Sequence, residues 1–473
     1  FTGTASDATL LNDTCKVTLS GLDPATEYAY RCGDGNKWSS IYYFTTRDSN
    51  NYNTILVGDI QLDKNARNAG VWEKVLNHAI AKFPNASFLM AAGDQVDIGS
   101  DELRFEYLLA PPALRSLPMI AAVGNHEGGN SFNAPNLDYH FNNPNSDKKL
   151  GATLGGCDFY FSYGNTLYMI INSNSTNNAQ HEQFMAEAVA SHPDAIWKIA
   201  MMHHSPYSSS IWGLSSDVLA IRDTLCPLFD AYGVDIVVGG HDHNFTRSYF
   251  MKGGQIEADQ TVLDPSKEIT SADAGTYVNP KGTLYMSLST PSGSAYVSLT
   301  ETKGFWAATR NDLRVPQYSN MEIDDSHLTF TTYRSDTGEV IDTITIMKTP
   351  HTHTWEAGWK YDEANHWKEC SCGEKNDEAA HVPSDWIIDV AASETANGSM
   401  HKECTICGYV IATEIIVATG DSKPSDSSDD GKEQSPDTGG NSKRLLCFLL
   451  GGASLTLFGL TVKRRKRYAT ITK

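Results

Sequence analysis

The pattern of apolar and polar positions changes once along this chain. Up to residue 46, apolar and polar side chains alternate, as in CKVTLSGL and EYAYRC, which is typical of half-buried strands. From Tyr52 onward, six near-continuous apolar runs each end in a polar residue that could bind a ligand: NTILVGD, SFLMAAGD, LPMIAAVGN, TLYMIIN, KIAMMHH and VDIVVGGH. Segments with helical spacing, such as VWEKVLNHAIAKF, separate some of them. This pattern predicts an α/β fold with its site at the carboxyl ends of buried strands.

The 473 residues correspond to about three average domains, so the chain is expected to be modular. We expect a partial β-sandwich over 1–47, an α/β domain over 50–348, a Cys/His-rich module over 351–415, a spacer over 416–434 and a terminal segment over 435–473. The spacer is too polar to pack and is expected to be disordered.

Charge is strongly segregated along the chain. The sequence has 37 Lys and Arg against 57 Asp and Glu, and its last eight bases all follow the last acid, so residues 1–437 carry 29 − 57 = −28. An acidic body without a basic cluster repels a polyanion. Nucleic acid is therefore excluded as a partner.

The terminal segment combines three features of a surface anchor. The motif Ser435-Pro436-Asp437-Thr438-Gly439 precedes 18 uncharged residues at 445–462, and KRRKR follows them. The uncharged stretch is just long enough to span a membrane, and its basic end is expected to stay cytoplasmic. Together the three features resemble the sorting signal of Gram-positive surface proteins, although Ser435 stands where the family has Leu. The resemblance implies that a sortase cleaves between Thr438 and Gly439 and joins the exported chain to peptidoglycan.

Five short motifs suited to metal binding occur in order at the ends of apolar runs. They are Gly58-Asp59, Gly93-Asp94, Gly124-Asn125-His126-Glu127, His203-His204 and Gly240-His241-Asp242-His243. One Gly-Asp pair is commonly a turn, but five such motifs in order are not expected by chance. Asp, Asn and His supply the carboxylate, amide and imidazole ligands that two divalent or trivalent metals need. Such a pair lowers the pKa of water and neutralises phosphoryl charge, which predicts phosphate-ester hydrolysis.

These motifs resemble those of the calcineurin-like metallophosphoesterases, especially the purple acid phosphatase-like branch, over about residues 1–345. In that branch a fibronectin type III-like domain precedes a catalytic domain with two β-sheets flanked by helices. The resemblance implies that Asp59 and His243 bind the first metal and that Asp94 bridges the two. It implies that Asn125, His203 and His241 bind the second metal. It also implies that His126 protonates the leaving group.

Two positions depart from the family. Purple enzymes have a Tyr three residues after the bridging Asp, where this chain has Asp97, so no iron charge-transfer colour is expected. Other branches have a His where Gln61 stands; the Gln61 amide oxygen could bind the metal weakly or leave the position to water. His203 directly ends its apolar run and is taken as the ligand, which leaves His204 to face the substrate, while Asp97 and Glu127 are expected to orient ligands. The metals could be Fe, Zn or Mn.

The Cys/His-rich module contains a weak duplication. Each half has a Cys pair that is preceded by His and followed by Gly, namely Cys370 and Cys372, then Cys404 and Cys407. This spacing suits a structural zinc site, and the module is too poor in aliphatic residues to fold by burial alone. It also resembles Cys/His repeats in surface proteins of anaerobic Firmicutes. Zinc held by these four residues and disulfide bonds both remain open.

The function predicted is a cell-surface, two-metal phosphoesterase that hydrolyses extracellular phosphate monoesters. A phosphodiesterase using the same metals is one alternative, and a surface-binding protein with a decayed catalytic domain is another. Six metal ligands in order argue against decay, because binding alone does not require them. The expected partners are small phosphate esters, sortase and peptidoglycan, and the membrane before processing.

Overall fold

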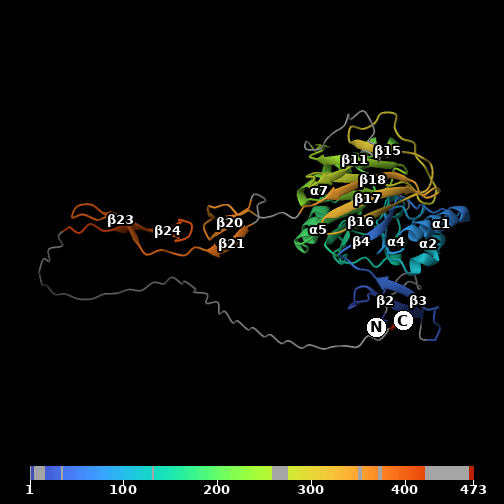
Figure 1. Ribbon diagram of the computed structural model, residues 1–473, viewed down its shortest axis with the longest axis horizontal. Coiled ribbons are helices and arrows are strands. Elements are labelled where there is room, and N and C mark those ends of the chain that lie inside the picture. Colours follow the sequence, from blue (N-terminus) through green and yellow to red (C-terminus); the bar gives the residue numbers. More distant parts are fainter. Residues whose placement is uncertain are drawn as a thin grey trace, which may run out of the picture. The chain divides into compact units, whose positions relative to one another are not determined.

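The chain forms two compact units. The computed structural model describes residues 2–4, 16–33, 36–129, 133–257, 275–349, 354–370, 375–420 and 468–472 (Figure 1). The first unit comprises residues 1–349 with 464–473, and the second comprises residues 350–463.

A four-stranded sheet contains the N-terminal residues. Its order is β1 (Thr2–Thr4), β25 (Tyr468–Thr472), β2 (Thr26–Gly33) and β3 (Tyr42–Thr46). The rings of Tyr28 and Phe44 stack across the β2–β3 pair with centroids 5.5 Å apart. The buried Tyr28 hydroxyl accepts a hydrogen bond of 2.7 Å from the backbone nitrogen of Asp23. This bond has the form of the tyrosine corner that is typical of sandwich domains.

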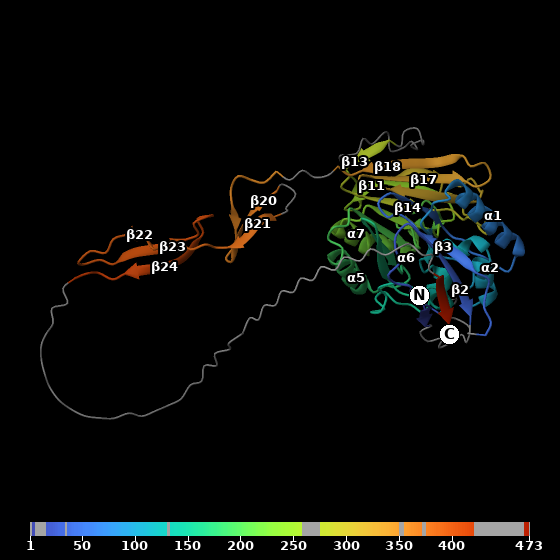
Figure 2. The same cartoon turned by 60° about the horizontal axis from the view of Figure 1, so that its bottom comes forward.

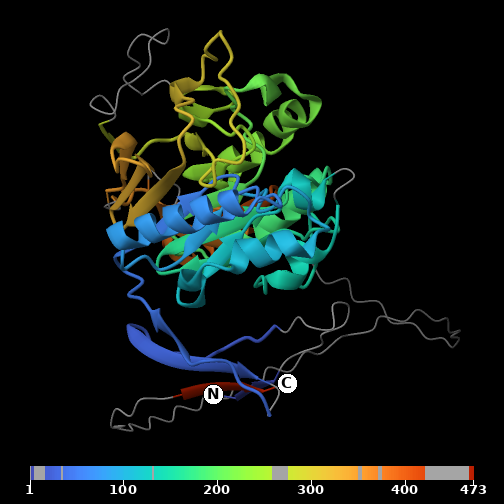
Figure 3. The same cartoon turned by 90° about the vertical axis from the view of Figure 1, so that its right-hand side faces the viewer.

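The last strand of this sheet bears on the expected anchor. Strand β25 pairs in parallel with both β1 and β2 (Figure 3). In an uncleaved chain with a span at 445–462, residues 468–472 would lie across the membrane from β2, so the two arrangements exclude each other. The span, the spacer from residue 421 and the motif at 435–439 lie outside the described residues. Among the described residues, no helix is long and apolar enough to cross a membrane.

The catalytic region contains two larger sheets. The seven-stranded sheet has the order β13 (Thr276–Val278), β18 (Val340–Met347), β17 (His327–Arg334), β16 (Gln317–Ile323), β4 (Tyr52–Val57), β5 (Leu89–Ala91) and β6 (Met119–Ala121). The eight-stranded sheet has the order β12 (Gln255–Ile256), β11 (Phe245–Lys252), β14 (Thr283–Ser287), β10 (Ile236–Gly239), β9 (Trp197–Met202), β8 (Thr166–Ile171) and β7 (Phe159–Tyr163), with β15 (Ala307–Asn311) paired to β11.

Helices cover the outer faces of these sheets (Figures 1 and 2). The helices packed outside the seven-stranded sheet are α1 (Ala66–Lys82) and α2 (Glu102–Leu109), followed by the 3-10 turn η1 (Pro112–Arg115). Those outside the eight-stranded sheet are α5 (Asn178–Ala190), α6 (Ser216–Thr224) and α7 (Cys226–Tyr232). Short segments near the site are α3 (Asn125–Gly128), α4 (Asn136–His140) and η3 (Ile211–Leu214).

Three apolar layers explain why the central strands read as continuous apolar runs. Along β4, Leu56 faces the core between the sheets, whereas Ile55 and Val57 face the core beneath the helices. Along β9, Met201 faces the core between the sheets, whereas Met202 faces the core beneath the helices that cover the eight-stranded sheet. Because side chains alternate between faces, a strand buried on both must be apolar at every position. The predicted α/β fold, with two sheets flanked by helices, is confirmed.

One buried ion pair links the two large sheets. The guanidinium of Arg247 on β11 donates to both carboxylate oxygens of Asp342 on β18, at 2.7 and 3.1 Å. Both side chains are about 1% exposed. Each charge therefore pairs with an opposite charge on the other sheet.

The second unit consists of two small sheets. They are β19 (Lys360–Tyr361), β20 (Asn365–Glu369) and β21 (Lys375–Ala380), then β22 (Ile387–Val390), β23 (Gly398–Glu403) and β24 (Val410–Ile416). An isolated bridge joins Trp355 to Cys370 in the first repeat, and another joins Pro383 to Cys404 in the second. The two repeats thus share one local topology.

Candidate metal centre

The predicted ligands come from neighbouring strands in two sheets. Asp59, Asp94 and Asn125 follow β4, β5 and β6, which are adjacent and parallel in the seven-stranded sheet. His203 follows β9, and the loop 240–243 follows β10, its parallel neighbour in the eight-stranded sheet. Parallel strands carry their carboxyl ends to one edge, so all these side chains converge there.

Four ligand atoms converge at the position predicted for the second metal. Asn125 Oδ1 lies 2.9 Å from His203 Nε2 and 3.0 Å from His241 Nδ1, and the two nitrogens are 3.2 Å apart. Asp94 Oδ2 lies 3.2 Å from His203 Nε2. The Nδ1–H of His203 donates to the carbonyl of Ala92 at 3.0 Å, so the ring presents a lone pair at Nε2 once a metal has displaced the second proton. A lone pair facing an amide oxygen is satisfied by a cation, so this donor set fits a metal.

Asp59 and His243 form the position predicted for the first metal. His243 Nε2 lies 3.3 Å from Asp59 Oδ1, and the Asp59 oxygens accept the backbone N–H of His241 at 3.0 and 2.9 Å. One ligand atom each from Asp59, Asp94 and His203 lie within 4.8 Å of one another. Asp94 lies close enough to both sets to serve as the bridge.

Local backbone conformation allows this convergence. At Gly93, with φ +90°, a Cβ would lie 2.4 Å from His203 Nδ1, and at Gly124 a Cβ would lie 2.0 Å from Asp94 Oδ1. Asp94 and His241 themselves have φ values of +46° and +68°. Such conformations are costly for residues with a side chain and gather at functional sites. The glycines before the ligands are therefore required by close packing.

Electrostatics at the site favour bound positive charge. Burial acts to lower the pKa of His203, but Asp94 and Asp59 outweigh it and raise that pKa to about 10. Burial acts to raise the pKa of Asp94, but His203 and His126 lower it overall. Burial and the neighbouring histidines lower the pKa of His241. A field that holds protons on one imidazole also attracts a metal cation, and the metal releases those protons when it binds.

His126 faces the cluster without being part of it. Its Nδ1–H donates to the carbonyl of Asp97 at 2.6 Å, so Nε2 accepts from the side-chain amide of Gln61 at 3.0 Å. His126 Nε2 also lies 3.7 Å from Asp94 Oδ2, and the ring is 24% exposed. Gln61 thus directs its amide nitrogen to His126. The ring nitrogen that can exchange a proton is held at the edge of the metal position.

Asp97 and Glu127 act on the ligands indirectly. The carboxylate of Asp97 pairs with Arg104, and only its carbonyl contacts His126. Glu127 is fully buried, and its carboxylate accepts the backbone N–H groups of Val96 and Gly124, both at 3.0 Å. Burial and the charge of Asp94 raise the pKa of Glu127 to about 8. Glu127 joins the loops that carry Asp94 and the 125–126 pair.

His204 lines a pocket beside the cluster, with its ring centroid 4.6 Å from that of His241. Its backbone N–H donates to the Ser173 hydroxyl at 3.2 Å, and that hydroxyl lies 2.8 Å from His204 Nδ1. Burial and the charge of His203 lower the pKa of His204 to about 3, so the ring is neutral. Its Nε2 lies 3.8 Å from a carboxylate oxygen of Asp217, which favours the tautomer with the proton on Nε2. The pocket, of about 260 Å³, is also lined by Asn125, Asn174 and Asp217. His204 therefore offers this pocket an N–H donor.

Two neighbours of the site were not singled out by the sequence pattern. The Asp242 carboxylate accepts the hydroxyls of Ser208 and Ser210 at 2.7 and 2.9 Å, which ties the loop 240–243 in place, and burial raises its pKa to about 6. Its position between two predicted ligands was the available signal. Trp212 is 40% exposed with its ring 5.9 Å from that of His241, and no pattern in the sequence marked it.

Comparison with known proteins places these features in context. Residues 52–245 match the family model for calcineurin-like phosphoesterases, and residues 2–46 match that for the purple acid phosphatase N-terminal domain. Human acid phosphatase type 7 is 23% identical over 369 residues, which cover 70% of this chain and 76% of that protein. The zebrafish acid phosphatase type 7 is 25% identical over 371 residues, covering 71% and 78%.

A solved structure shares the fold. Purple acid phosphatase from yellow lupin seeds aligns with a TM-score of 0.55 and 19% identity, covering 66% of this chain and 57% of the lupin chain. This chain thus spans just over half the length of that structure.

Proposed function

We propose that the chain hydrolyses phosphate monoesters with two metal ions. Residues 52–245 match the family model for calcineurin-like phosphoesterases and residues 2–46 match that for the purple acid phosphatase N-terminal domain, and both matches support the proposal. The observation that carries this proposal is the convergence of Asn125 Oδ1, His203 Nε2 and His241 Nδ1 within 3.2 Å of one another beside Asp94. When the ring of His203 is neutral, its proton is on Nδ1, so the lone pair of Nε2 faces the lone pairs of Asn125 Oδ1. Their arrangement makes chemical sense with a cation at their centre.

Asp59 and His243 would hold one metal, Asn125, His203 and His241 the other, and Asp94 would contact both. Bound there, two cations lower the pKa of water and neutralise the charge that develops on a phosphoryl group. Three of the proposed ligands, Asp59, Asp94 and His203, are at most 1% exposed. This burial strengthens every electrostatic interaction in the site.

His126 would act as the proton donor. Its ring is held by Asp97, so Nε2 stays directed to the edge of the metal position. In the protonated ring, Nε2–H can pass its proton to the leaving alkoxide, and partial exposure allows the ring to regain one from water.

His204 would position the substrate. Its Nε2–H faces the pocket beside the second metal position, where it can donate to a phosphoryl oxygen. The neutral ring can do so across a wide pH range because its pKa is about 3. The acidic Asp217 in the same pocket disfavours negative charge on the leaving group, so uncharged or cationic leaving groups are favoured.

We also propose, from the sequence, that this chemistry takes place at the cell surface. The support is the three-part arrangement of the motif at 435–439, the span at 445–462 and the basic end. Cleavage after Thr438 would remove β25, and the remaining N-terminal strands would then keep β2 paired with β3.

The activity is tested with purified protein and a panel of phosphate monoesters and diesters. Preferential turnover of monoesters, lost after metal removal and restored by Fe, Zn or Mn, is the expected result. Preferential turnover of diesters would assign the same centre to a phosphodiesterase, and no turnover with any metal would end the enzyme proposal.

A further inference from the structure

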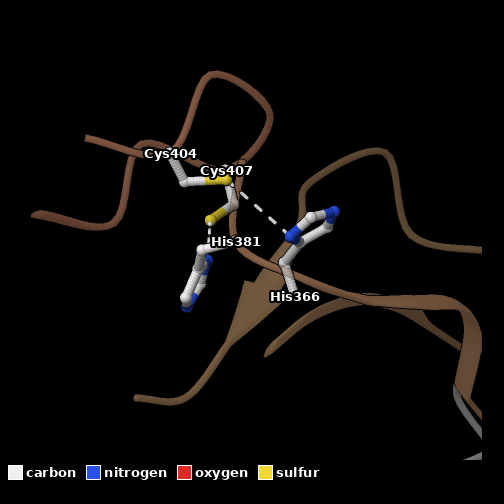
Figure 4. A group of neighbouring side chains, drawn as sticks. All are labelled: His366, His381, Cys404 and Cys407. Atoms are coloured by element: carbon white, nitrogen blue, oxygen red, sulfur yellow. Dashed lines mark hydrogen bonds between the residues drawn. The ribbon is translucent and has the colours of Figure 1, made fainter. Parts of the chain in front are cut away.

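We infer that the second unit contains a structural zinc site of two cysteines and two histidines, formed by His366, His381, Cys404 and Cys407. One ligand atom from each of these residues lies within 4.8 Å of the others (Figure 4). His366 and His381 come from the first repeat and the segment after it, whereas both cysteines come from the second repeat. The zinc would therefore join the two repeats into one body.

The distances match tetrahedral coordination. Cys404 Sγ lies 3.7 Å from His366 Nδ1, and Cys407 Sγ lies 3.4 Å from His381 Nδ1. Zn–S and Zn–N bonds of about 2.3 and 2.0 Å at a tetrahedral angle place sulfur and nitrogen about 3.5 Å apart. The four side chains are thus already close to the spacing that zinc requires.

Neighbouring groups orient His381 for this role. Its Nε2–H donates to the carbonyl of Asp362 at 2.9 Å, which leaves the lone pair of a neutral ring on Nδ1 toward Cys407. The ring also stacks on Tyr409 with centroids 4.7 Å apart. A hydrogen bond from the second ring nitrogen to a carbonyl is the usual way in which proteins fix a zinc-binding histidine.

The Cys404 turn is suited to a metal thiolate. The backbone N–H of Gly408 donates to the Cys404 carbonyl at 2.9 Å, and the φ of +77° at Gly408 closes the turn. The backbone N–H groups of Cys407 and Ile406 also donate to the Cys404 sulfur. A thiolate is the form that binds zinc, so the turn favours the liganding state.

The rest of the unit supplies little apolar burial. Of its described residues, 354–370 and 375–420, only four are buried, namely His366, Cys370, Gly398 and Cys404. Every residue of β21 and β22 is exposed. With so few buried side chains, burial cannot offset the entropy of folding, whereas binding of zinc to four ligands can.

This ligand set corrects the one predicted from the sequence. Cys370 is buried at the position equivalent to Cys404 but is not in the group, and Cys372 lies outside the described residues. The two histidines replace that pair because the strands of the first repeat turn His366 toward the second repeat. Cys404 and Cys407 are not joined in a disulfide.

Cobalt substitution in the full chain tests the site directly. No cysteine is among the ligands of the phosphatase centre, so a thiolate-to-cobalt charge-transfer absorption reports the Cys/His site alone. We expect this absorption in the wild type and its loss in Cys404→Ser and His381→Ala. It should persist in His401→Ala, a matched control whose ring pairs with Asp389 at 2.6 Å outside the group, and in Asp94→Asn. Absence from the wild type, or persistence in Cys404→Ser, would overturn the inference.

Thiol labelling of the wild type covers the case in which the variants misfold. In the zinc-loaded chain, the peptide containing Cys404 and Cys407 should resist alkylation, and a chelator should expose both thiols. Equal labelling with and without the chelator would contradict a metal site. A Cys404–Cys407 disulfide in freshly purified protein would do so as well.

Discussion

Replacing His126 by alanine separates proton donation from metal binding. Alanine keeps the backbone N–H that donates to Asp94 Oδ1 at 2.8 Å, and none of the six proposed metal ligands changes. Metal content should therefore match the wild type. The substitution removes the imidazole ring that the Asp97 carbonyl holds at the edge of the metal position.

The loss should depend on the leaving group. A positioned general acid contributes about 10²- to 10⁴-fold, or about 3–5 kcal/mol of barrier, when the leaving alkoxide needs a proton. Alkyl phosphates should therefore lose about 10²-fold or more in kcat, whereas activated aryl phosphates, whose leaving groups depart as anions, should lose far less. Gln61→Ala removes only the donor to His126 Nε2 and should cause a small, uniform change.

The assay is kcat across esters of increasing leaving-group pKa, with metal content measured on the same samples. His192→Ala serves as the control, since its ring contacts Ser191 and the Ala188 carbonyl at the end of α5. A steep dependence on leaving-group pKa in His126→Ala and a shallow one in the wild type is the predicted result. An equal loss for alkyl and aryl esters would refute the acid role of His126.

Three further predictions concern stability, metal colour and location. Arg247→Met leaves Asp342 buried without its partner and should lower the free energy of unfolding in urea by about 3–5 kcal/mol, and Arg247→Met with Asp342→Leu should recover most of that stability. An unchanged unfolding midpoint in the single variant would contradict the described pair. Iron-loaded wild type should show no visible phenolate charge-transfer band, because Asp97 stands in place of the Tyr and its carboxylate pairs with Arg104; such a band would mean that another tyrosine reaches the metal. Removing residues 435–473 should release active enzyme into the medium, and the Thr438→Ala protein should stay in the membrane fraction. Aggregation of the truncated chain would show that the N-terminal sheet needs β25.

The fold was predictable because its strands are buried on both faces. Runs such as TILV and IAMM leave no polar face, and only a layered α/β arrangement accommodates several of them. The polar residue after each run then marked the edge of the sheet where Asp94 and His203 meet. His203 was taken as the ligand in place of His204 because it directly ends its apolar run. In the structure, His203 lies in the ligand cluster and His204 lines the neighbouring pocket.

Other features depend on contacts between distant segments. Asp242 matters through Ser208 and Ser210, and only folding brings those hydroxyls to it. Trp212 lies in a short turn without periodic apolar positions. In the second unit, sequence spacing drew attention to the cysteine pairs, but which histidines join them depends on how two repeats meet. Spacing within each repeat carried no information on that contact.

The central claim is that two metals held by one bridging carboxylate perform the hydrolysis. The most direct test is metal content per chain, measured with monoester turnover in the wild type and in Asp94→Asn, both carrying Cys404→Ser so that only the phosphatase centre contributes. We predict about two metals and turnover in the Asp94 protein, and loss of at least one metal together with most activity in Asp94→Asn, because a neutral amide binds two cations weakly. Full metal content and unchanged turnover in Asp94→Asn would contradict the account.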